Sequence, residues 1–339
     1  MRIAVYGAGA LGTILGAYLT RNAPEHEIHL FNRNLRHVQA LNEGGARITG
    51  QIGFTQKVKA FLPEEMEGEY DYIFLLTKQL ENAKTIEFLK PHLRSDGALC
   101  TMQNGLPEPP IAQVLGRERT LGCTIGWGAT LGEPGESRLT SSPDALVFTL
   151  GSPYPEAKWH LPKVRCILEN MGTVYIEENF LGARWSKLLI NATFSGMGTV
   201  IGGTFGDVCD NRMARRLAQK VIKECIEVTK AAGIRIAPVM GNDIARLFYY
   251  SNPLKRFVSY SLIPFAMRRH RGIIPGMLVD IRKGKPCEVD AIVGSACREG
   301  DRVNVETPVC DMMYSMIRSF EMGNGVPSTD NLAQFSALS

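Results

Sequence analysis

The sequence feature that most constrains the fold is the pattern G-x-G-x-x-G near the start of the chain, formed by Gly7, Gly9 and Gly12. The preceding residues 3–6 (Ile-Ala-Val-Tyr) have the length and composition of one buried β-strand. The following residues 11–19 carry apolar side chains at helical spacing. A glycine pattern between a strand and a helix predicts the turn that binds the phosphates of a dinucleotide.

Each glycine has a physical reason in such a turn. We expect Gly7 to permit the tight turn, Gly9 to let the backbone approach a pyrophosphate, and Gly12 to let the helix pack closely on the strand. The N–H groups and the dipole of the helix start attract phosphate charge. The predicted cofactor-binding residues of the turn are Gly7, Ala8, Gly9, Ala10, Leu11 and Gly12.

The end of the next predicted strand, 27–31, bears on which dinucleotide binds. Domains that prefer NAD place Asp or Glu about 20 residues beyond the last glycine, where the carboxylate holds the ribose 2′-hydroxyl. This chain has Asn32, Arg33 and Asn34 there instead, and Arg36 follows. The planar guanidinium of Arg33 matches a phosphate, so we predict NADPH as the cofactor. The alternative is that Arg33 and Arg36 are solvated surface residues.

Composition excludes little but sets the class of protein. The 339 residues suffice for one or two domains, and the net charge of +4 does not suggest nucleic acid or a membrane as partner. No apolar run reaches the ~18 residues of a membrane span, and we expect no signal segment because a strand begins almost at Met1. The eight cysteines form no C-x-x-C pair. We therefore expect no metal site, and reduced cysteines in a cytoplasmic protein.

Two further apolar runs, 71–77 and 97–102, alternate with segments of helical periodicity. This alternation predicts an α/β fold with a parallel, doubly wound sheet, as in Rossmann-type domains. Ligands bind beyond the carboxyl ends of the strands in such sheets. Lys78 and Asn104 lie just past these two strand ends, so we expect both residues near the cofactor.

The pattern changes after residue 120. Residues 121–150 are short β-like runs punctuated by glycine and proline, typical of an antiparallel extension of the sheet, and 173–176 is the last strand signal. The segments with helical periodicity beyond it are 180–200, 212–232, 238–249, 289–299 and 309–321. We predict a Rossmann-type NADP(H)-binding domain at 1–178 and an all-helical domain at 179–322 that carries the substrate and catalytic residues. Residues 323–339, rich in turn formers, are expected to be a flexible tail.

Two segments of the helical domain carry candidate chemical groups. Lys187 and Asn191 are spaced i, i+4 and share one face of a predicted helix. Apolar neighbours could desolvate Lys187 and suit it to proton donation; the alternative is a surface lysine at the edge of an amphipathic helix. Glu288 and Asp290 are expected in the first turn of a later helix, where they could merely complement the helix dipole.

Taken together, these residues resemble the ketopantoate reductase (2-dehydropantoate 2-reductase) family. The resemblance rests on the glycine turn, on Lys78 after a strand, on Asn104-Gly105, on Trp185-Ser186-Lys187-Leu188-x-x-Asn191, and on Cys287-Glu288-Val289-Asp290, in order along nearly the whole chain. It implies a Rossmann domain, a helical domain and an active site in the cleft between them. It also implies NADPH-dependent reduction of a 2-oxo acid, in pantothenate and coenzyme A biosynthesis, by a monomer or homodimer.

The resemblance also implies roles for individual residues. Lys187 would be the general acid that protonates the carbonyl oxygen, and Glu288 would hold the substrate hydroxyl and help fix Lys187. Asn104 would lie at the nicotinamide and Lys187, and Lys78 near cofactor and substrate. Asn191 would contact the substrate. These roles fit hydride addition, which turns a carbonyl oxygen into a developing alkoxide that an ammonium stabilises.

Two positions that contact substrate in the family depart from its pattern. Ser195 stands where the family usually has a second asparagine, and Gly276 stands where it usually has serine before a Met-Leu-x-Asp-Ile run. These departures put ketopantoate itself in doubt, though not the hydride chemistry. The basic stretch 249–272 is also long for the family, and is either a solvated helix face or a lid that recognises a different acid.

The sequence therefore leaves three hypotheses for the function of the chain. The first is a 2-oxo acid reductase of the ketopantoate type, or one for a different 2-oxo acid. The second is a 3-hydroxyacid dehydrogenase-like enzyme, although Leu11-Gly12-Thr13 lacks the methionine usual in the first turn of that group. The third is an NADP(H)-binding sensor without turnover, which would have no need for Lys187, Asn104 and Glu288 together.

Overall fold

The computed structural model describes residues 1–239 and 241–338 of the chain. The chain forms two compact units. The first comprises Met1–Gln103 and Pro107–Phe180, and the second comprises Asn104–Leu106 and the residues from Leu181 onward. The division between Phe180 and Leu181 falls two residues after the boundary expected from the sequence.

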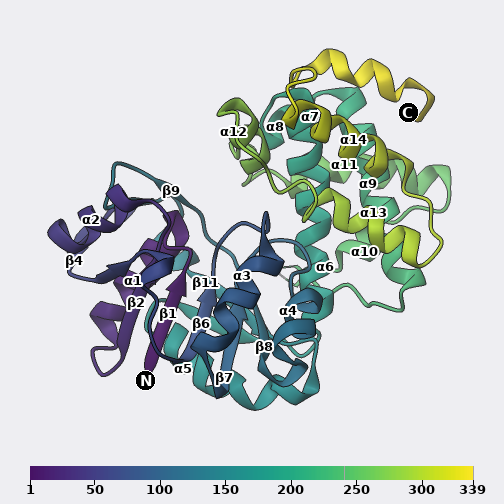
Figure 1. Cartoon of the computed structure of the whole chain (residues 1–339). Helices are drawn as coiled ribbons and strands as arrows, with labels where there is room; N and C mark the ends of the chain where they lie inside the picture. The colour runs from purple at the N-terminus through teal and green to yellow at the C-terminus, as the bar shows by residue number, and fades with distance from the viewer. Residues whose placement is uncertain (240, 339) are drawn as a thin grey trace. The chain divides into compact units, whose positions relative to one another are not determined.

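The first unit is built on an eight-stranded sheet with the order β12-β11-β8-β7-β6-β1-β2-β5 (Figure 1). Neighbouring strands are parallel except for the pair β8 and β11. The strands are β1 (Arg2–Tyr6), β2 (Glu27–Phe31), β5 (Lys59–Phe61), β6 (Tyr70–Leu75), β7 (Leu93–Thr101), β8 (Thr120–Ile125), β11 (Val147–Gly151) and β12 (Thr173–Ile176). The α/β, Rossmann-type class predicted for this region is confirmed.

Helices cover both faces of this sheet, which explains why its central strands contain continuous apolar runs such as residues 3–6 and 72–75. One buried cluster joins strand residues to α1 and α5, and another joins the opposite strand residues to α3 and α4. The helices and helical turns of the unit are α1 (Ala10–Asn22), α2 (Leu35–Gly44), η1 (Pro63–Glu65), α3 (Asn82–Leu89), η2 (Lys90–His92), α4 (Glu108–Leu115), η3 (Arg117–Arg119), η4 (Pro143–Ala145), η5 (Pro155–His160) and α5 (Leu161–Leu168).

A second sheet of four strands differs from the sequence prediction. It contains β3 (Ala46–Gly50), β4 (Phe54–Gln56), β9 (Ala129–Leu131) and β10 (Glu136–Leu139), in the order β4-β3-β10-β9. Residues 121–150 are therefore not one antiparallel extension. Only β8 and β11 join the large sheet, while β9 pairs with β10 and β10 pairs with β3. Partner choice between sheets is a non-local property, which alternation along the sequence does not specify.

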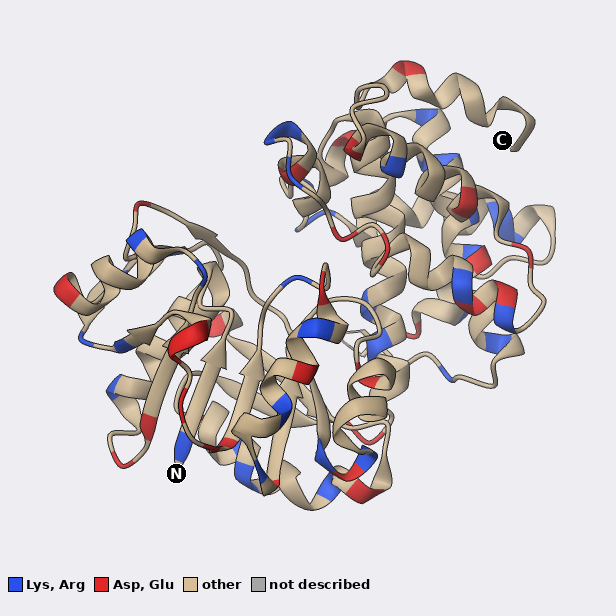
Figure 2. Cartoon of the chain, in the orientation of Figure 1, with Lys and Arg blue, Asp and Glu red and all other residues tan. Residues whose placement is uncertain are grey.

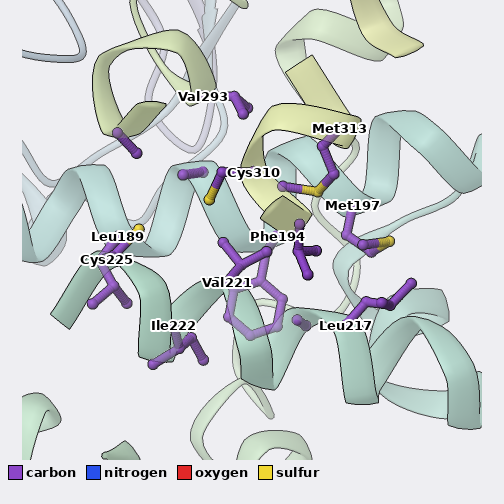
Figure 3. Close-up of a cluster of buried hydrophobic side chains, with 14 of the residues drawn as sticks. Leu189, Phe194, Met197, Leu217, Val221, Ile222, Cys225, Val293, Cys310 and Met313 are labelled. Carbon is purple, nitrogen blue, oxygen red and sulfur yellow. The ribbon is translucent and has the colours of Figure 1, made fainter. Parts of the chain in front are cut away.

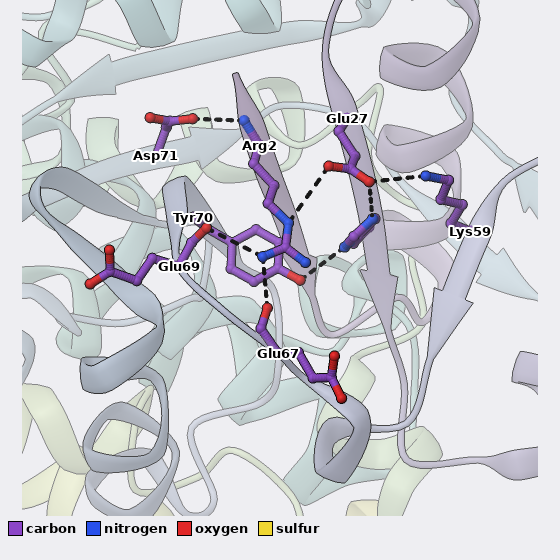
Figure 4. A network of polar contacts seen from close by, with 8 residues as sticks. Arg2, Glu27, Lys59, Glu67, Glu69, Tyr70 and Asp71 are labelled. Carbon is purple, nitrogen blue, oxygen red and sulfur yellow. Dashed lines mark hydrogen bonds and ion pairs between the residues drawn. The ribbon is translucent and has the colours of Figure 1, made fainter.

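The amino ends of the strands are fastened by a polar network (Figure 4). The Arg2 backbone N–H donates to Asp71 Oδ2 at 2.7 Å, and the Arg2 guanidinium lies 4.5 Å from the centre of the Tyr70 ring. Glu27 accepts from Lys59 Nζ at 2.9 Å and pairs with Arg2. These charges lie at the edge opposite the carboxyl ends where ligands bind in such sheets, so we assign the network a structural role.

The second unit is helical, as predicted, and surrounds one apolar core (Figures 1 and 3). The core includes Leu189, Phe194, Val221, Cys310 and Met313, which come from four different elements. The elements are α6 (Phe180–Ile190), the π-helical turn η6 (Asn191–Gly196), α7 (Met197–Ile201), α8 (Phe205–Asp210), α9 (Arg212–Ala231), α10 (Ile244–Phe248), α11 (Pro253–Ala266), α12 (Gly276–Arg282), α13 (Val293–Arg302), α14 (Pro308–Glu321) and η7 (Thr329–Leu338). The unit therefore has helices at α8, α11 and α12 that the periodicity did not indicate.

The expectation of a flexible tail at 323–339 is not met where the structure describes that segment. Thr329–Leu338 forms the helical turn η7. Leu332 is 6% exposed and Phe335 is fully buried, both in the core of the second unit. Burial of two large apolar side chains stabilises a segment that turn-forming residues alone would leave unordered.

Basic residues and acidic residues are both spread over each of the two units (Figure 2). The sequence 244–279, which contains α10 and α11, is an exception because it holds Lys and Arg but no Asp or Glu. Among the described helices, none combines the length and the apolar character needed to cross a membrane.

Candidate functional site

The glycine turn of the first unit has the geometry that its sequence predicts. Gly7 has φ +100°, and a Cβ there would lie 2.6 Å from the Thr77 backbone nitrogen. A Cβ on Gly12 would lie 2.4 Å from the Gly7 carbonyl oxygen. Gly7 and Gly12 are therefore required by the protein itself, since backbone atoms cannot yield to a Cβ.

Gly9 is different, because a Cβ there would meet no atom within 4 Å. The residue is the N-cap of α1, and it offers no side chain to the N–H groups of the first helical turn. Open space beside uncapped helix N–H groups is what an incoming pyrophosphate needs. The geometry of the turn therefore fits a dinucleotide.

The end of β2 supplies one tethered residue and one exposed cation. Asn32 donates from Nδ2 to the Ala8 carbonyl oxygen at 2.7 Å and accepts from the Asn34 N–H at 2.8 Å. The side chain of Arg33 is 78% exposed and its Nη1 lies 3.4 Å from Glu81 Oε2. Asn32 thus stabilises the glycine turn. Arg33 makes only a weak surface ion pair, which it can break in order to bind a phosphate.

The chain segments beyond β6 and β7 are held together by a buried amide pair. Gln103 is 3% exposed, and its Nε2 donates to Asn82 Oδ1 at 2.7 Å while Asn82 Nδ2 donates back to Gln103 Oε1 at 3.1 Å. Gln103 also donates to the Thr77 carbonyl oxygen at 2.9 Å. Lys78, which is exposed, therefore follows a residue whose backbone is fixed.

In the second unit, α6 positions Lys187 by burying the residues around it. Trp185, Leu188 and Leu189 are each at most 2% exposed, while Lys187 is half-buried. Ser186 donates to the Ala237 carbonyl oxygen at 2.5 Å, which fixes the helix against the chain that follows α9. Lys187 thus follows and precedes residues of the apolar core while it is itself only partly buried.

Asn191 lies where α6 gives way to the π-helical turn η6. A π-helical turn inserts one residue into the helical repeat, and such turns are frequent at functional sites. Asn191 keeps the i, i+4 relation to Lys187, but Ser195 lies inside the widened turn and is 9% exposed. Ser195 is therefore presented by the widened turn η6 and not by a regular α-helical repeat.

Helices from distant parts of the sequence surround η6. Its neighbours are α9, α12, α13 and α14. Gly276 begins α12, and a Cβ at Gly276 would meet no atom within 4 Å. The preceding residue, Pro275, lies against Gly198, two residues beyond η6. Gly276 and Ser195 thus belong to elements that pack together.

Glu288 is half-buried and lies between two residues tied to α14. The Cys287 N–H donates to Glu321 Oε1 at 2.6 Å, and Tyr314 donates to Asp290 Oδ1 at 2.6 Å. The prediction that Glu288 and Asp290 fall in the first turn of a helix is wrong, because α13 begins only at Val293. The Glu288 carbonyl oxygen accepts from the Ile292 N–H at 3.0 Å, and the hydrogen bonds of Cys287 and Asp290 tie the same segment to α14.

The structure sorts the predicted site residues into two groups. Gly7, Ala8, Gly9, Ala10, Leu11, Gly12, Arg33 and Lys78 belong to the first unit. Asn104, Lys187, Asn191, Ser195, Gly276 and Glu288 belong to the second. Asn104 precedes Gly105, whose φ of +77° marks the sharp turn at this place in the chain.

The arrangement of potential metal ligands and the state of the Cys287 thiol are further features of the part of the chain that the structure describes. No group of three or more His, Cys, Asp or Glu residues is arranged there to hold a metal ion. Burial raises the pKa of Cys287 to about 12, so its thiol is protonated at neutral pH. Cys287 contributes a backbone N–H rather than a nucleophile.

Sequence reasoning missed the supporting residues Gln103 and Asn82. The sequence could have indicated the role of Gln103, because this polar residue comes directly after a buried strand and directly before Asn104. Buried polar side chains need partners, so such a residue predicts a hydrogen-bonded pair. The identity of the partner, Asn82, could not be predicted, because it lies 21 residues away on another element.

Comparison with known proteins gives matches along almost all of the chain. Residues 3–152 match the family described as ketopantoate reductase PanE/ApbA, and residues 179–321 match its C-terminal region. A 2-dehydropantoate 2-reductase from Pyrococcus horikoshii is 26% identical over 329 residues, covering 96% of this chain and 99% of the relative.

Solved structures show the same fold. A D-mandelate dehydrogenase with NADH and anilino(oxo)acetate has a TM-score of 0.80 at 22% identity, covering 96% of this chain and all of the other. A dimeric ketopantoate reductase from Staphylococcus aureus has a TM-score of 0.72 at 18% identity, with the same coverage of both chains.

Proposed function

The chain belongs to the ketopantoate reductase family, and on that premise we propose that it is an oxidoreductase that reduces a 2-oxo acid to a 2-hydroxy acid with NADPH. The reaction would be of the ketopantoate-to-pantoate type. The observation that carries the proposal is the open turn at Gly9, which leaves room for a pyrophosphate, in one chain with Lys187 and Asn191 at helical i, i+4 spacing. A protein that only senses NADP(H) would need the turn but not that pair.

We assign the chemical roles to residues of the second unit. A bound reduced nicotinamide supplies a hydride to the carbonyl carbon. Lys187 donates a proton to the carbonyl oxygen, where negative charge develops. Glu288 holds the substrate hydroxyl and orients Lys187, while Asn191 contacts the substrate and Asn104 the nicotinamide. The half-burial of Lys187 and Glu288 supports these roles, because both reach solvent from a fixed backbone.

We assign cofactor preference to Arg33. The exposed guanidinium and the Asn32 side chain at the end of β2 favour the additional phosphate of NADPH over a bare ribose. The structural neighbour with bound NADH shows that the fold also accepts the other cofactor. The preference therefore depends on these local residues and not on the fold.

The second candidate is a reductase of a different 2-oxo acid. Two observations favour it. Ser195 and Gly276 stand where the family usually has asparagine and serine, and the chain shares its fold with a D-mandelate dehydrogenase. The open space beside Gly276 leaves room for a substrate group that a serine side chain would otherwise fill. A 3-hydroxyacid dehydrogenase is less well supported, because the family match covers both units.

The test is a panel of branched, hydroxylated and aromatic 2-oxo acids, with NADPH consumption followed by absorbance. Turnover of ketopantoate above all others would support the ketopantoate type, and turnover of an aromatic or unhydroxylated acid would support the second candidate. Tight NADPH binding without consumption on any acid would contradict both and favour a sensor.

We also propose that the chain forms a homodimer through an apolar surface on α11. Leu254, Phe257, Val258 and Phe265 recur along one side of this helix and are 73%, 69%, 46% and 69% exposed. Exposed apolar surfaces of this kind mark interaction sites. A second copy is the occupant that the dimeric structural neighbour supports, and a twofold axis would pair the surface with itself.

Light scattering after size-exclusion chromatography tests this assembly. We expect a dimer for the wild type and a monomer for Phe257→Glu with Phe265→Glu. Tyr175→Glu, which changes another aromatic residue that is 59% exposed, is the control and should remain dimeric. A monomeric wild type would overturn the proposal, and binding of that monomer to anionic vesicles would assign the surface to a membrane instead.

A further inference from the structure

The four-stranded sheet of the first unit is connected to the glycine turn through hydrogen bonds that no role above explains. The connection begins at Gly135, next to β10, and ends at the Ala8 carbonyl oxygen. Between them lie His37 on α2 and Thr13 on α1. His37 is 1% exposed and Thr13 is fully buried, so these polar groups have been placed in the protein interior.

The direction of each hydrogen bond follows from the one before it. The Gly135 N–H donates to His37 Nδ1 at 3.1 Å, so Nδ1 is unprotonated. The neutral imidazole then carries its proton on Nε2, which lies 3.1 Å from Thr13 Oγ1 and donates to it. The Thr13 hydroxyl in turn donates to the Ala8 carbonyl oxygen at 3.0 Å. Burial lowers the pKa of His37 and keeps this tautomer uncharged at neutral pH.

The Ala8 carbonyl oxygen receives a second hydrogen bond from Asn32 Nδ2 at 2.7 Å. A carbonyl oxygen has two lone pairs, so both are used. This oxygen belongs to the peptide that joins Ala8 to Gly9, and Gly9 is the residue with open space for a pyrophosphate. A second contact from the same sheet supports the start of α1, because Ser137 on β10 donates to the Ala10 carbonyl oxygen at 2.6 Å.

From this chain of hydrogen bonds we propose that His37 and Thr13 are positioning residues for cofactor binding. They hold the Ala8–Gly9 peptide in the orientation that receives the pyrophosphate, and they make the four-stranded sheet a brace for the glycine turn. The inference rests on the proposed function, because it presumes that the turn binds a dinucleotide. Because the turn is already ordered before the cofactor binds, less of the binding free energy is lost in ordering it.

Paired substitutions at Thr13 isolate the hydroxyl. Thr13→Val keeps the volume but removes the donor to Ala8 and leaves His37 Nε2 without an acceptor, whereas Thr13→Ser keeps both bonds. We expect Thr13→Val to weaken NADPH and NADH binding equally, on the order of 10-fold, because the two cofactors share the pyrophosphate. Thr13→Ser should bind within about threefold of the wild type.

Thr20→Val is the matched control on the same helix. The Thr20 hydroxyl donates to the Gly16 carbonyl oxygen within α1 at 2.7 Å, away from the glycine turn. This variant should bind both cofactors like the wild type. Calorimetric dissociation constants, with thermal melts to confirm folding, give the comparison.

Wild-type affinity in a folded Thr13→Val variant would overturn the inference while leaving the proposed function intact. Equal weakening in Thr13→Ser and Thr13→Val would also overturn it, by assigning the effect to packing. Failure of the wild type to bind either cofactor would overturn both proposals.

A measurement on the wild type covers the case in which Thr13→Val does not fold. Nitrogen-15 NMR of the His37 ring should show a protonated Nε2 and an unprotonated Nδ1 at neutral pH. A protonated Nδ1 would break the link to Gly135 and overturn the inference.

Discussion

The two units provide for their proposed roles in different ways. The first unit presents backbone N–H groups to the proposed cofactor. It depends on glycines, because a Cβ would collide with the backbone at Gly7 and Gly12 and would fill the open space at Gly9. The second unit presents side chains, and it holds them on α6, on the π-helical turn η6 and on a loop tied to α14. A backbone site is specified by a few adjacent residues, whereas a side-chain site depends on elements far apart in the sequence.

This difference predicts that substitutions in the two units affect different steps. Changes in the first unit should alter cofactor affinity and leave the proton transfer intact. Changes at the residues of the second unit that are assigned to substrate and proton transfer should alter turnover and substrate choice and leave cofactor affinity intact.

The largest effect is expected for Lys187→Ala. Loss of the proton donor should lower kcat by a factor on the order of 10² or more. NADPH binding should be nearly unchanged, because the phosphates are held by the glycine turn. Steady-state kinetics and a binding isotherm on the same preparation measure both, and a variant with near wild-type kcat would remove the catalytic assignment of Lys187.

Gly9→Ala should produce the converse result. The new methyl group meets no protein atom within 4 Å, so the fold should be unaffected. It occupies the space of the pyrophosphate, and NADPH binding should weaken on the order of 10- to 100-fold. Gly276→Ala, also at an open position, serves as the control for an added methyl group and should retain NADPH affinity. Unchanged NADPH affinity in Gly9→Ala would contradict the assignment of this turn as the pyrophosphate-binding site.

Restoring the family's polar residues should change substrate choice without changing cofactor affinity. Gly276→Ser with Ser195→Asn should raise kcat/KM for ketopantoate by about 10-fold, because an unpaired buried polar group costs about 1–3 kcal/mol. The competing result is a wild-type kcat/KM for ketopantoate of ~10⁴ M⁻¹s⁻¹ or more, in the ordinary range for enzymes. That value would show that the two departures do not redirect specificity.

Arg33→Ala should have a smaller and more selective effect. We expect KM for NADPH to rise by about 5-fold and KM for NADH to stay unchanged, because only NADPH carries the additional phosphate. Arg36→Ala is the control, as a neighbouring exposed arginine without an assigned role. Equal losses for both cofactors would count against the assignment of Arg33.

The smallest effect concerns pH and again separates the units. Burial lowers the pKa of His29, His37 and His160, all in the first unit, and the pKa of His160 falls to about 4. The unfolded chain binds these protons more readily, so the first unit loses stability as pH falls from about 6.5 toward 4. Burial raises the pKa of Glu224 in the second unit, and its contribution is instead present at low pH and lost as pH rises.

Hydrogen exchange of the whole chain at pH 7 and pH 5, corrected for intrinsic rates, can detect this difference. Protection of the first unit should fall more than that of the second. The opposite order would mean that groups other than these histidines dominate the acid response.

The sequence predicted what is local. The Gly7–Gly12 turn, the strand ends that precede Lys78 and Asn104, and the Lys187–Asn191 relation each depend on a few neighbouring residues, and the structure contains them. The separate four-stranded sheet was not predicted, because β10 pairs with β3 from 89 positions earlier in the register. The helical turn η7 was missed for the same reason, since Leu332 and Phe335 are ordered by a distant core. The π-helical turn at Asn191 has no periodicity signal that separates it from an α-helix.

The most direct test of the central claim is to trace the hydride. NADPH carrying deuterium at both hydrogen positions of the nicotinamide carbon that donates the hydride is incubated with the best 2-oxo acid, and the product is analysed by mass spectrometry. Our account predicts a 2-hydroxy acid with one deuterium on its hydroxyl-bearing carbon. A product without deuterium, or deuterated NADPH that stays unoxidised while bound, would contradict the assignment of this chain as a hydride-transferring reductase.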